Sequence, residues 1–336
     1  MRLLITTQAV DKTHPNLSLF HRWIEEFAKH CESVDVICLY EGPHSLPGNV
    51  RVYSLGKEHG VVSRAVYAMR FFKTLSRVRK YDAVFVHMNP EYVVLAGWWW
   101  RLTGKKIALW YTHKSVTPTL RMAVFFVTRI FTASRESFRI QSPKVRVVGH
   151  GIDTERFRWD GIQKSGLNIA TVGRISPTKQ IVEMLDALEV LHQGGTPFTF
   201  SIAGGPLMEQ DSVYEQKVKK NIETRTFFPS IRMDGVVSYD NLPQWLSDKS
   251  VFLNLSLTGS VDRAVLEAAA MGVVPVSTNE AFQDMLAPYG LYVESNPKSI
   301  ADGIIRASHT DPASLADYVR REHAIATLIL KILADI

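Results

Sequence analysis

The sequence predicts an α/β protein with two doubly wound parallel-sheet domains, and three observations lead to this prediction. Short apolar segments alternate with longer segments of helical periodicity along the chain. The alternation stops in a polar stretch at 153–166 and restarts after it. The halves also differ in charge: residues 1–150 hold 22 Lys and Arg against 10 Asp and Glu, whereas residues 151–336 hold 17 against 23.

In the first half, each short apolar segment is expected to form a parallel strand. These segments are 2–7, 34–40, 50–55, 83–88, 106–112, 130–134 and 145–153. Amphipathic periodicity predicts a helix over about 17–30 after the first strand. A basic run, 70–80, lies in a later helical segment of this half.

The second half repeats the alternation. Its expected strands are 166–173, 198–205, 231–237, 251–257 and 273–278, with a helix over about 180–193. We therefore expect one domain at 1–155, a second at 156–313, and a C-terminal helix at 314–336 that packs back on the first domain. Parallel sheets bind ligands at the carboxyl ends of their strands, so the site is expected in a cleft between the domains.

The composition indicates the cellular compartment and the kinds of binding partner that are expected. Cys31 and Cys38 form neither a disulfide framework nor a metal pattern, which favours the cytoplasm. The basic first half lacks a nucleic-acid motif, so no nucleic acid is expected as a partner. Basic residues beside Trp98, Trp99 and Trp100 suit an anionic membrane surface, which would place the chain peripherally on its inner face. The alternative is that the tryptophans pack in the core and the charges face solvent.

Two expected strands in the second half end in segments that could bind phosphate groups. In "IATVGRISPTKQIV", Gly173, Arg174 and Lys179 lie between a strand and a helix N-terminus, where charge and free N–H groups converge. In "FSIAGGPL", Gly204 and Gly205 allow close approach of a backbone to a phosphate. The alternative for the first loop is two exposed basic side chains.

Together with "LTGSVDRAVLEAAAMG" at 257–272, these segments resemble the donor-binding half of the retaining family-4 glycosyltransferases, which belong to the glycosyl transferases group 1 and have the GT-B fold. "VRVVGHGIDTERF" resembles the interdomain signature of that family, with His150 in place of an Asn. The resemblance covers essentially the whole chain and is strongest at about 145–278. It implies metal-independent transfer of a sugar from a UDP- or GDP-sugar to an acceptor hydroxyl, with retention of configuration and no cofactor.

The resemblance also implies roles for matching residues. Arg174 and Lys179 would grip the donor diphosphate and stabilise the charge of the leaving group. Glu267 matches a glutamate that binds the ribose hydroxyls, and its alternative is an ion pair with Arg263. His113 matches a histidine near the primary hydroxyl of the sugar, and its alternative is a structural role.

Gly259 departs from the family, because the usual residue there is a glutamate that contacts the donor sugar. The turn still delivers backbone N–H groups of Gly259, Ser260 and Val261 at an expected helix N-terminus. Asp262 could accept sugar hydroxyls, or Arg263 could pair with a phosphate or a sugar carboxylate. The alternative is that Asp262 complements the helix dipole and Arg263 is solvated.

The loop after the first strand is the second departure, because the family often has glycines there. This chain has Asp11, Lys12 and His14, which we expect to face the acceptor. Asp11 could orient an acceptor hydroxyl, or it could close a turn before the following helix.

These features favour a glycosyltransferase of surface-glycan or glycolipid synthesis, with a glycan or lipid-linked acceptor. Gly259 leaves open a second function, a non-catalytic sugar-nucleotide-binding protein. A third, a sugar-nucleotide epimerase or hydrolase on the same fold, would need a pair of acid/base carboxylates that the sequence does not locate.

Overall fold

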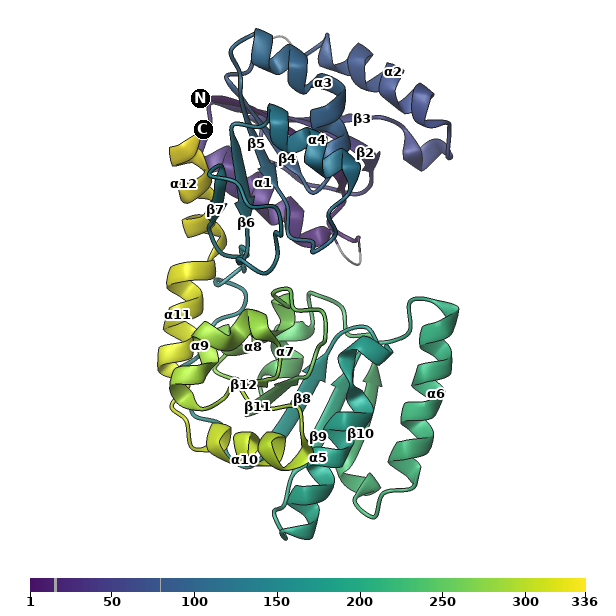
Figure 1. Ribbon diagram of the computed structural model, residues 1–336, viewed down its shortest axis with the longest axis vertical. Coiled ribbons are helices and arrows are strands. Elements are labelled where there is room, and N and C mark those ends of the chain that lie inside the picture. Colours follow the sequence, from purple (N-terminus) through teal and green to yellow (C-terminus); the bar gives the residue numbers. More distant parts are fainter. Residues whose placement is uncertain (15–16, 79) are drawn as a thin grey trace. The chain divides into compact units, whose positions relative to one another are not determined.

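The computed structural model describes residues 1–14, 17–78 and 80–336. Pro15 and Asn16 of the loop after the first strand, and Arg79 of the basic run, lie outside the described residues. The chain forms two compact units, one of Met1–Asp153 with Glu322–Ile336 and the other of Thr154–Arg321. Each unit contains a sheet flanked by helices (Figure 1).

The described part of the first unit has parallel strands in the order β3-β2-β1-β4-β5-β6-β7. Their bounds are β1 Arg2–Val10, β2 Ser33–Glu41, β3 Val50–Ser54, β4 Ala83–His87, β5 Lys106–Trp110, β6 Arg129–Thr132 and β7 Val145–Val147. β1 pairs with both β2 and β4, with Leu3 opposite Val34 and Ala83. Leu3, Leu4 and Ile5 are fully buried, as expected for a parallel strand covered on both faces.

Helices cover this sheet. They are α1 Ser18–His30, α2 Arg64–Leu75, α3 Pro90–Leu102, α4 Pro118–Phe126 and α12 Ile325–Asp335. The hydroxyls of Ser63 and Thr117 cap α2 and α4 by accepting from backbone N–H groups at 3.4 and 3.1 Å. Proline opens α3 and α4 because the first helical position needs no N–H donor.

The three tryptophans of α3 divide between the core and the surface. Trp100 is fully buried, and its Nε1 donates to the hydroxyl of Tyr81 at 3.1 Å. Trp98 and Trp99 are 49% and 47% exposed. Core packing therefore accounts for Trp100, and binding of Trp98 and Trp99 to a membrane stays a prediction.

The second unit has parallel strands in the order β10-β9-β8-β11-β12. Its strands are β8 Asn168–Val172, β9 Thr199–Ala203, β10 Ile231–Gly235, β11 Val251–Asn254 and β12 Val274–Ser277. Its helices are α5 Ile181–Gln193, α6 Glu209–Glu223, α7 Leu242–Leu246, α8 Arg263–Ala270, α9 Gln283–Leu286, α10 Pro297–Ser308 and α11 Ala313–His323, of which the last two residues belong to the first unit. The chain leaves β8 for β9 and β10 on one side, then crosses to β11 and β12 on the other (Figure 1). The strand order therefore reverses between β8 and β11, where such sheets bind ligands.

The segment 314–336, expected as one helix, forms parts of two. Ala324 separates α11 from α12 with an extended backbone, φ −63° and ψ 144°. There the N–H of Ile152 donates to the carbonyl of His323 at 2.6 Å, and the N–H of Ile325 donates to the carbonyl of Ile152 at 2.9 Å. α12 packs against α1 within the first unit.

Close packing requires glycine at positions 149 and 151, which precede Ile152 in the sequence. Both have positive φ, +91° and +75°. A Cβ on Gly149 would lie 2.0 Å from the carbonyl oxygen of Glu322, and one on Gly151 would lie 2.4 Å from the ring of Trp23. No side chain fits at either position.

Candidate functional site

The carboxyl ends of β8, β9 and β11 carry most of the residues that the sequence singled out. The loop after β8 contains Arg174 and Lys179, and the loop after β11 contains Gly259 and Asp262. The two loops are joined directly, because the N–H of Leu257 donates to the carbonyl of Thr178 at 3.1 Å. The reversal of strand order thus brings together residues about eighty positions apart.

Glycines allow the strand ends to approach each other. Gly204 has φ +145°, and a Cβ there would lie 1.8 Å from the carbonyl oxygen of Gly173. The N–H of Gly204 donates to the carbonyl of Gly235 at 2.7 Å, and the N–H of Ile175 donates to that of Gly205 at 3.0 Å. The close approach of the two backbones is therefore enough to require glycine at position 204, without any contact to a phosphate.

Lys179 lies across Gly173 and pairs with Asp262. A Cβ on Gly173 would meet the Lys179 side chain at 3.1 Å from Cε and 3.3 Å from Nζ. Nζ contacts Oδ2 of Asp262, which also accepts from Nδ2 of Asn254 at 3.0 Å. The Lys179 and Asp262 side chains are only 18% and 17% exposed. Asp262 therefore holds the cation in place.

Arg174 also has a carboxylate beside it. Its Nε lies 3.8 Å from Oδ2 of Asp211, which is almost fully buried. The same oxygen accepts from the N–H groups of Leu207 and Met208, at 3.2 and 3.1 Å. Asp211 thus fixes the loop after β9 and balances the charge of Arg174.

Glu267 of α8 is buried, with 4% of its surface exposed. Among the described residues its Oε1 has no hydrogen-bond partner, and it forms no ion pair with Arg263. Burial raises its pKa to about 7, while the charge of Arg263 lowers the pKa and that of Asp262 raises it. A buried carboxylate oxygen without a partner is costly, which suggests that a ligand satisfies it.

Gly259, Ser260 and Val261 lie just before α8, which begins at Arg263. The structure describes no acceptor for their three N–H groups. Asp262 occupies the N-cap position but makes no capping hydrogen bond, because its carboxylate is directed to Lys179 and Asn254.

The first-unit candidates lie on loops after β1 and β5. Oδ1 of Asp11 accepts from both N–H and Oγ1 of Thr13 at 2.7 Å, which closes a turn as the structural alternative expects. Nδ1 of His14 accepts from the N–H of Leu17 at 3.2 Å. His113 is exposed, and its Nδ1 accepts from the N–H of Ser115 at 3.1 Å.

The second unit is similar in sequence to glycosyltransferases. Residues 166–310 match the family model described as glycosyl transferases group 1. A GDP-mannose:cellobiosyl-diphosphopolyprenol alpha-mannosyltransferase of Xanthomonas campestris is 21% identical over 168 residues. That match spans 50% of this chain and 43% of the relative.

Solved structures resemble the whole chain. HepE of Anabaena in complex with UDP has a TM-score of 0.74 at 15% identity, with 99% of each chain covered. A glycosyltransferase from Rickettsia africae has a TM-score of 0.75 at 12% identity, covering 99% of this chain and 97% of that one. A trehalose-6-phosphate structure from E. coli, bound with UDP-2-fluoro glucose, has 0.72 at 12% identity, covering 100% and 98%.

The fold is GT-B. The predicted class, two doubly wound α/β domains of GT-B type, is confirmed by the two parallel sheets and by these structural neighbours. The family match, 166–310, contains every second-unit candidate from Gly173 to Glu267.

Sequence reasoning missed polar residues at the strand ends of both units. Asn254 ends β11, and Asn279 follows β12 and donates from Nδ2 to the carbonyl of Ser260 at 3.0 Å. His87 ends β4, where its ring stacks on Phe20 with centroids 3.8 Å apart. A polar residue at the end of an apolar strand was the available signal for Asn254 and His87.

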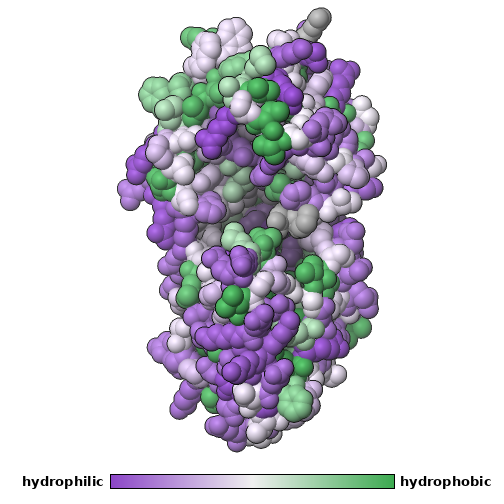
Figure 2. All heavy atoms as spheres, turned by 90° about the vertical axis from the view of Figure 1, so that its right-hand side faces the viewer, coloured by the Kyte–Doolittle hydropathy of each residue, from purple (hydrophilic) through white to green (hydrophobic). Residues whose placement is uncertain are grey.

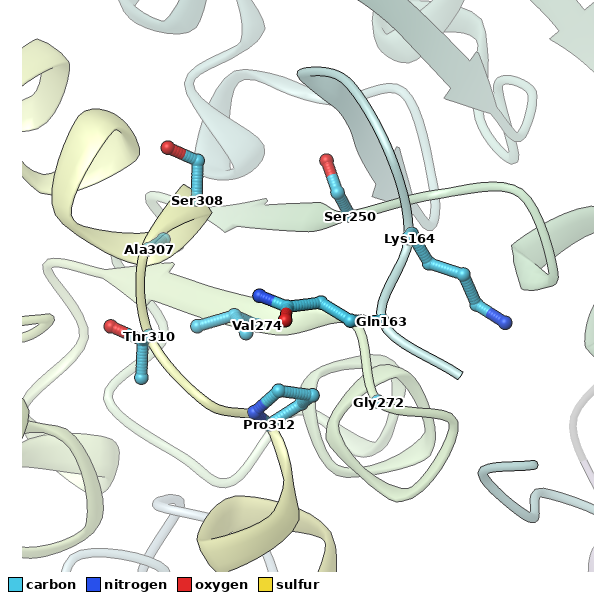
Figure 3. Close-up of a pocket in the computed structure, with 9 residues that line it drawn as sticks. All are labelled: Gln163, Lys164, Ser250, Gly272, Val274, Ala307, Ser308, Thr310 and Pro312. Atoms are coloured by element: carbon cyan, nitrogen blue, oxygen red, sulfur yellow. The ribbon is translucent and has the colours of Figure 1, made fainter. Parts of the chain in front are cut away.

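A small cavity lies at the amino ends of β11 and β12, lined by residues that include Ser250, Gly272 and Val274 (Figure 3). Its volume of about 10 Å³ has room for at most one water molecule. It lies at the opposite edge of the GT-B sheet from the candidate loops and is too small for a substrate.

Nowhere in residues 1–14, 17–78 and 80–336 is a helix long and apolar enough to span a bilayer. The same residues contain no group of three or more His, Cys, Asp or Glu suited to a metal ion.

Proposed function

We propose that this chain transfers a sugar from a nucleoside diphosphate sugar to an acceptor hydroxyl. The observation that carries the proposal is the grouping of Arg174, Lys179 and the buried, unsatisfied Glu267 around the carboxyl edge of one sheet. The family match over 166–310 supports sugar transfer. The UDP and UDP-2-fluoro glucose held by two neighbours support a UDP-sugar, and the curated relative supports a GDP-sugar.

In the proposed reaction Arg174 and Lys179 bind the diphosphate and stabilise the charge of the leaving group. Glu267 accepts from the ribose hydroxyls, which satisfies its unpaired oxygen. The backbones of Gly173, Gly204 and Gly205 approach the phosphates, and the turn from Gly259 to Arg263 faces the sugar. The acceptor attacks from the leaving-group side, the departing phosphate oxygen takes its proton, and configuration is retained. This scheme requires no metal or cofactor.

The acceptor is proposed to bind the first domain, 1–155, near Asp11, His14 and His113. Residues 156–313 would bind the donor, and the C-terminal segment 314–336 would complete the first domain. A glycan or lipid-linked acceptor is supported by the diphosphopolyprenol in the name of the curated relative. The basic first domain supports a cytoplasmic protein attached peripherally to an anionic membrane.

A second function, sugar-nucleotide binding without transfer, is favoured by two observations. Gly259 provides no sugar-contacting carboxylate, and Asp211 and Asp262 already pair with the two cations. An epimerase or hydrolase is less favoured, because Asp211 and Asp262 at this edge lie beside Arg174 and Lys179 and Glu267 is buried.

Diphosphate release from UDP-, GDP- and ADP-sugars, with and without membrane lipid extract, separates these functions. Release that requires the extract supports transfer, whereas binding without turnover supports the second function, and release without any acceptor supports hydrolysis. Arg174→Ala and Lys179→Ala should abolish release. Arg232→Ala is the matched control, because Arg232 is an exposed cation of the same unit. Unchanged release in the first two variants would refute the site.

A further inference from the structure

Two helices of the first unit leave large apolar side chains exposed to solvent. On α3, Trp98 and Trp99 are about half exposed, and Leu102 is 76% exposed. On α4, Met122 and Phe125 are 53% and 77% exposed. We call these five residues the α3–α4 apolar surface. Isolated exposed apolar residues are common in soluble proteins, so their arrangement decides whether they indicate an interaction.

The two helices are in direct contact, so the exposed residues belong to one region. A Cβ on Gly97 of α3 would lie 2.8 Å from Cβ of Phe126 on α4. Trp98 and Leu102 are four residues apart and share one face of α3, as Met122 and Phe125 share one face of α4. Figure 2 shows apolar side chains gathered on the first unit, in the upper part of the view.

The charge around this surface is strongly positive. Residues 64–126 contain 11 Lys and Arg but only two Asp and Glu, Asp82 and Glu91. Asp82 is already paired with Arg2, at 2.9 Å. Arg101 and Arg121 lie on α3 and α4 beside the apolar residues, and Lys105 follows α3. Apolar side chains among cations are typical of helices that bind anionic lipid.

We propose that the α3–α4 apolar surface docks on an anionic lipid bilayer. Trp98, Trp99, Leu102 and Phe125 enter the interfacial layer, where indole rings are favoured, and the neighbouring cations contact the headgroups. A second copy of the chain fits less well, because a twofold interface would place this basic surface against itself. The inference rests on the peripheral attachment proposed above, but it does not require sugar transfer.

The test is sedimentation of the full chain with phosphatidylcholine vesicles, with and without phosphatidylglycerol. The variant Leu102→Ser with Phe125→Ser should bind the anionic vesicles at least about tenfold more weakly than the wild type. Leu207→Ser with Phe228→Ser is the matched control, because Leu207 and Phe228 of the second unit are 65% and 54% exposed. All four side chains are exposed, so both variants should fold.

Equal binding by the two double variants would overturn the proposal, as would a wild type with no preference for anionic vesicles. A dimer that the first variant dissociates, with unchanged vesicle binding, would assign the surface to a second copy instead. UDP or GDP binding is measured on the same samples. If the chain binds nucleotide but does not bind the anionic vesicles, only this inference is wrong. If it binds the vesicles but does not bind UDP or GDP, only the proposed donor site is wrong.

Discussion

A hydrogen-bonded network of polar side chains connects β12 to Lys179. Oγ of Ser277 donates to Oδ1 of Asn254 at 3.2 Å, and Nδ2 of Asn254 donates to Oδ2 of Asp262 at 3.0 Å. Asp262 then pairs with Lys179. Ser277 and Asn254 are buried, so packing in the core fixes this end of the network. Asp262 consequently places Lys179 and also opposes the binding of a second negative group.

Asp262→Asn should therefore strengthen binding of a nucleoside diphosphate. The amide retains an oxygen that accepts from Asn254 but no longer repels phosphate, so we expect about fivefold tighter UDP or GDP binding, roughly 1 kcal/mol. Calorimetric titration with UDP and with uridine measures the effect, which should be absent for uridine. Asp240→Asn, an exposed position of the same unit, is the control. An equal gain for uridine would contradict the explanation.

Glu267 should make the second unit less stable as pH rises. Burial raises its pKa from 4.5 in the unfolded chain to about 7, so between these values the folded state holds a proton that the unfolded state lacks. The free energy of unfolding should therefore fall by about 3 kcal/mol as pH rises from 4.5 to above 7.

Glu267→Gln removes this titration and should be more stable than the wild type at pH 8 by up to about 3 kcal/mol. Urea unfolding at pH 5 and pH 8 measures the difference. Glu223→Gln, at the exposed end of α6, is the control. Identical pH dependence in wild type and Glu267→Gln would show that Glu267 is not buried as a neutral acid.

At the scale of elements, the sequence predicts strands better than loops. Each apolar segment contains a strand, and strands such as β4 and β11 are continuous apolar runs because both of their faces are buried. The edge strands β3, β7 and β10 are only partly buried. The position of Asp262, at the N-cap of α8, depends on a contact that the local sequence does not show, because Asp262 pairs with Lys179, 83 residues away. The break at Ala324 likewise depends on pairing with Ile152. Neither distant partner is visible in local sequence.

The turn that contains Gly149 and Gly151 gives a prediction at the same scale. Gly151→Ala should lower the free energy of unfolding by about 2–4 kcal/mol, because its Cβ would overlap the ring of Trp23. Gly104→Ala is the matched control, since Gly104 also has positive φ but has open space around it. It should lose about 1 kcal/mol. Equal losses in urea unfolding would mean that backbone strain alone makes glycine necessary.

At the scale of the whole molecule, the sequence predicted two doubly wound sheets because the alternation of elements restarts after a polar stretch. The same logic predicted which strand ends carry Arg174 and Lys179. It could not predict Asp211 or Asn254 as their supports, because charge balance and hydrogen bonding across a sheet depend on strand order. The site candidates of the first unit remain predictions for the same reason.

The two units should respond to pH in opposite directions. His323 belongs to the first unit and is buried, which lowers its pKa from 6.5 to about 4. Its Nδ1 accepts from the N–H of His150 at 3.2 Å, which requires the unprotonated nitrogen. Between these pH values the unfolded chain binds a proton that the folded chain does not. The free energy of unfolding of the first unit should therefore fall by about 3 kcal/mol as pH falls from 6.5 to 4. Over the same pH range Glu267 is protonated in the folded state, which makes the second unit more stable.

His323→Asn tests this opposition, because Oδ1 of Asn can accept the same hydrogen bond without titrating. Hydrogen exchange at pH 4.5 and pH 7 should show wild-type protection falling in acid in the first unit but not in the second. In His323→Asn, protection of the first unit should change less between the two pH values. His59→Asn is the control, because His59 is an exposed histidine of the same unit. If the variant lost protection in acid as the wild type does, another group would have to account for the acid sensitivity of α12.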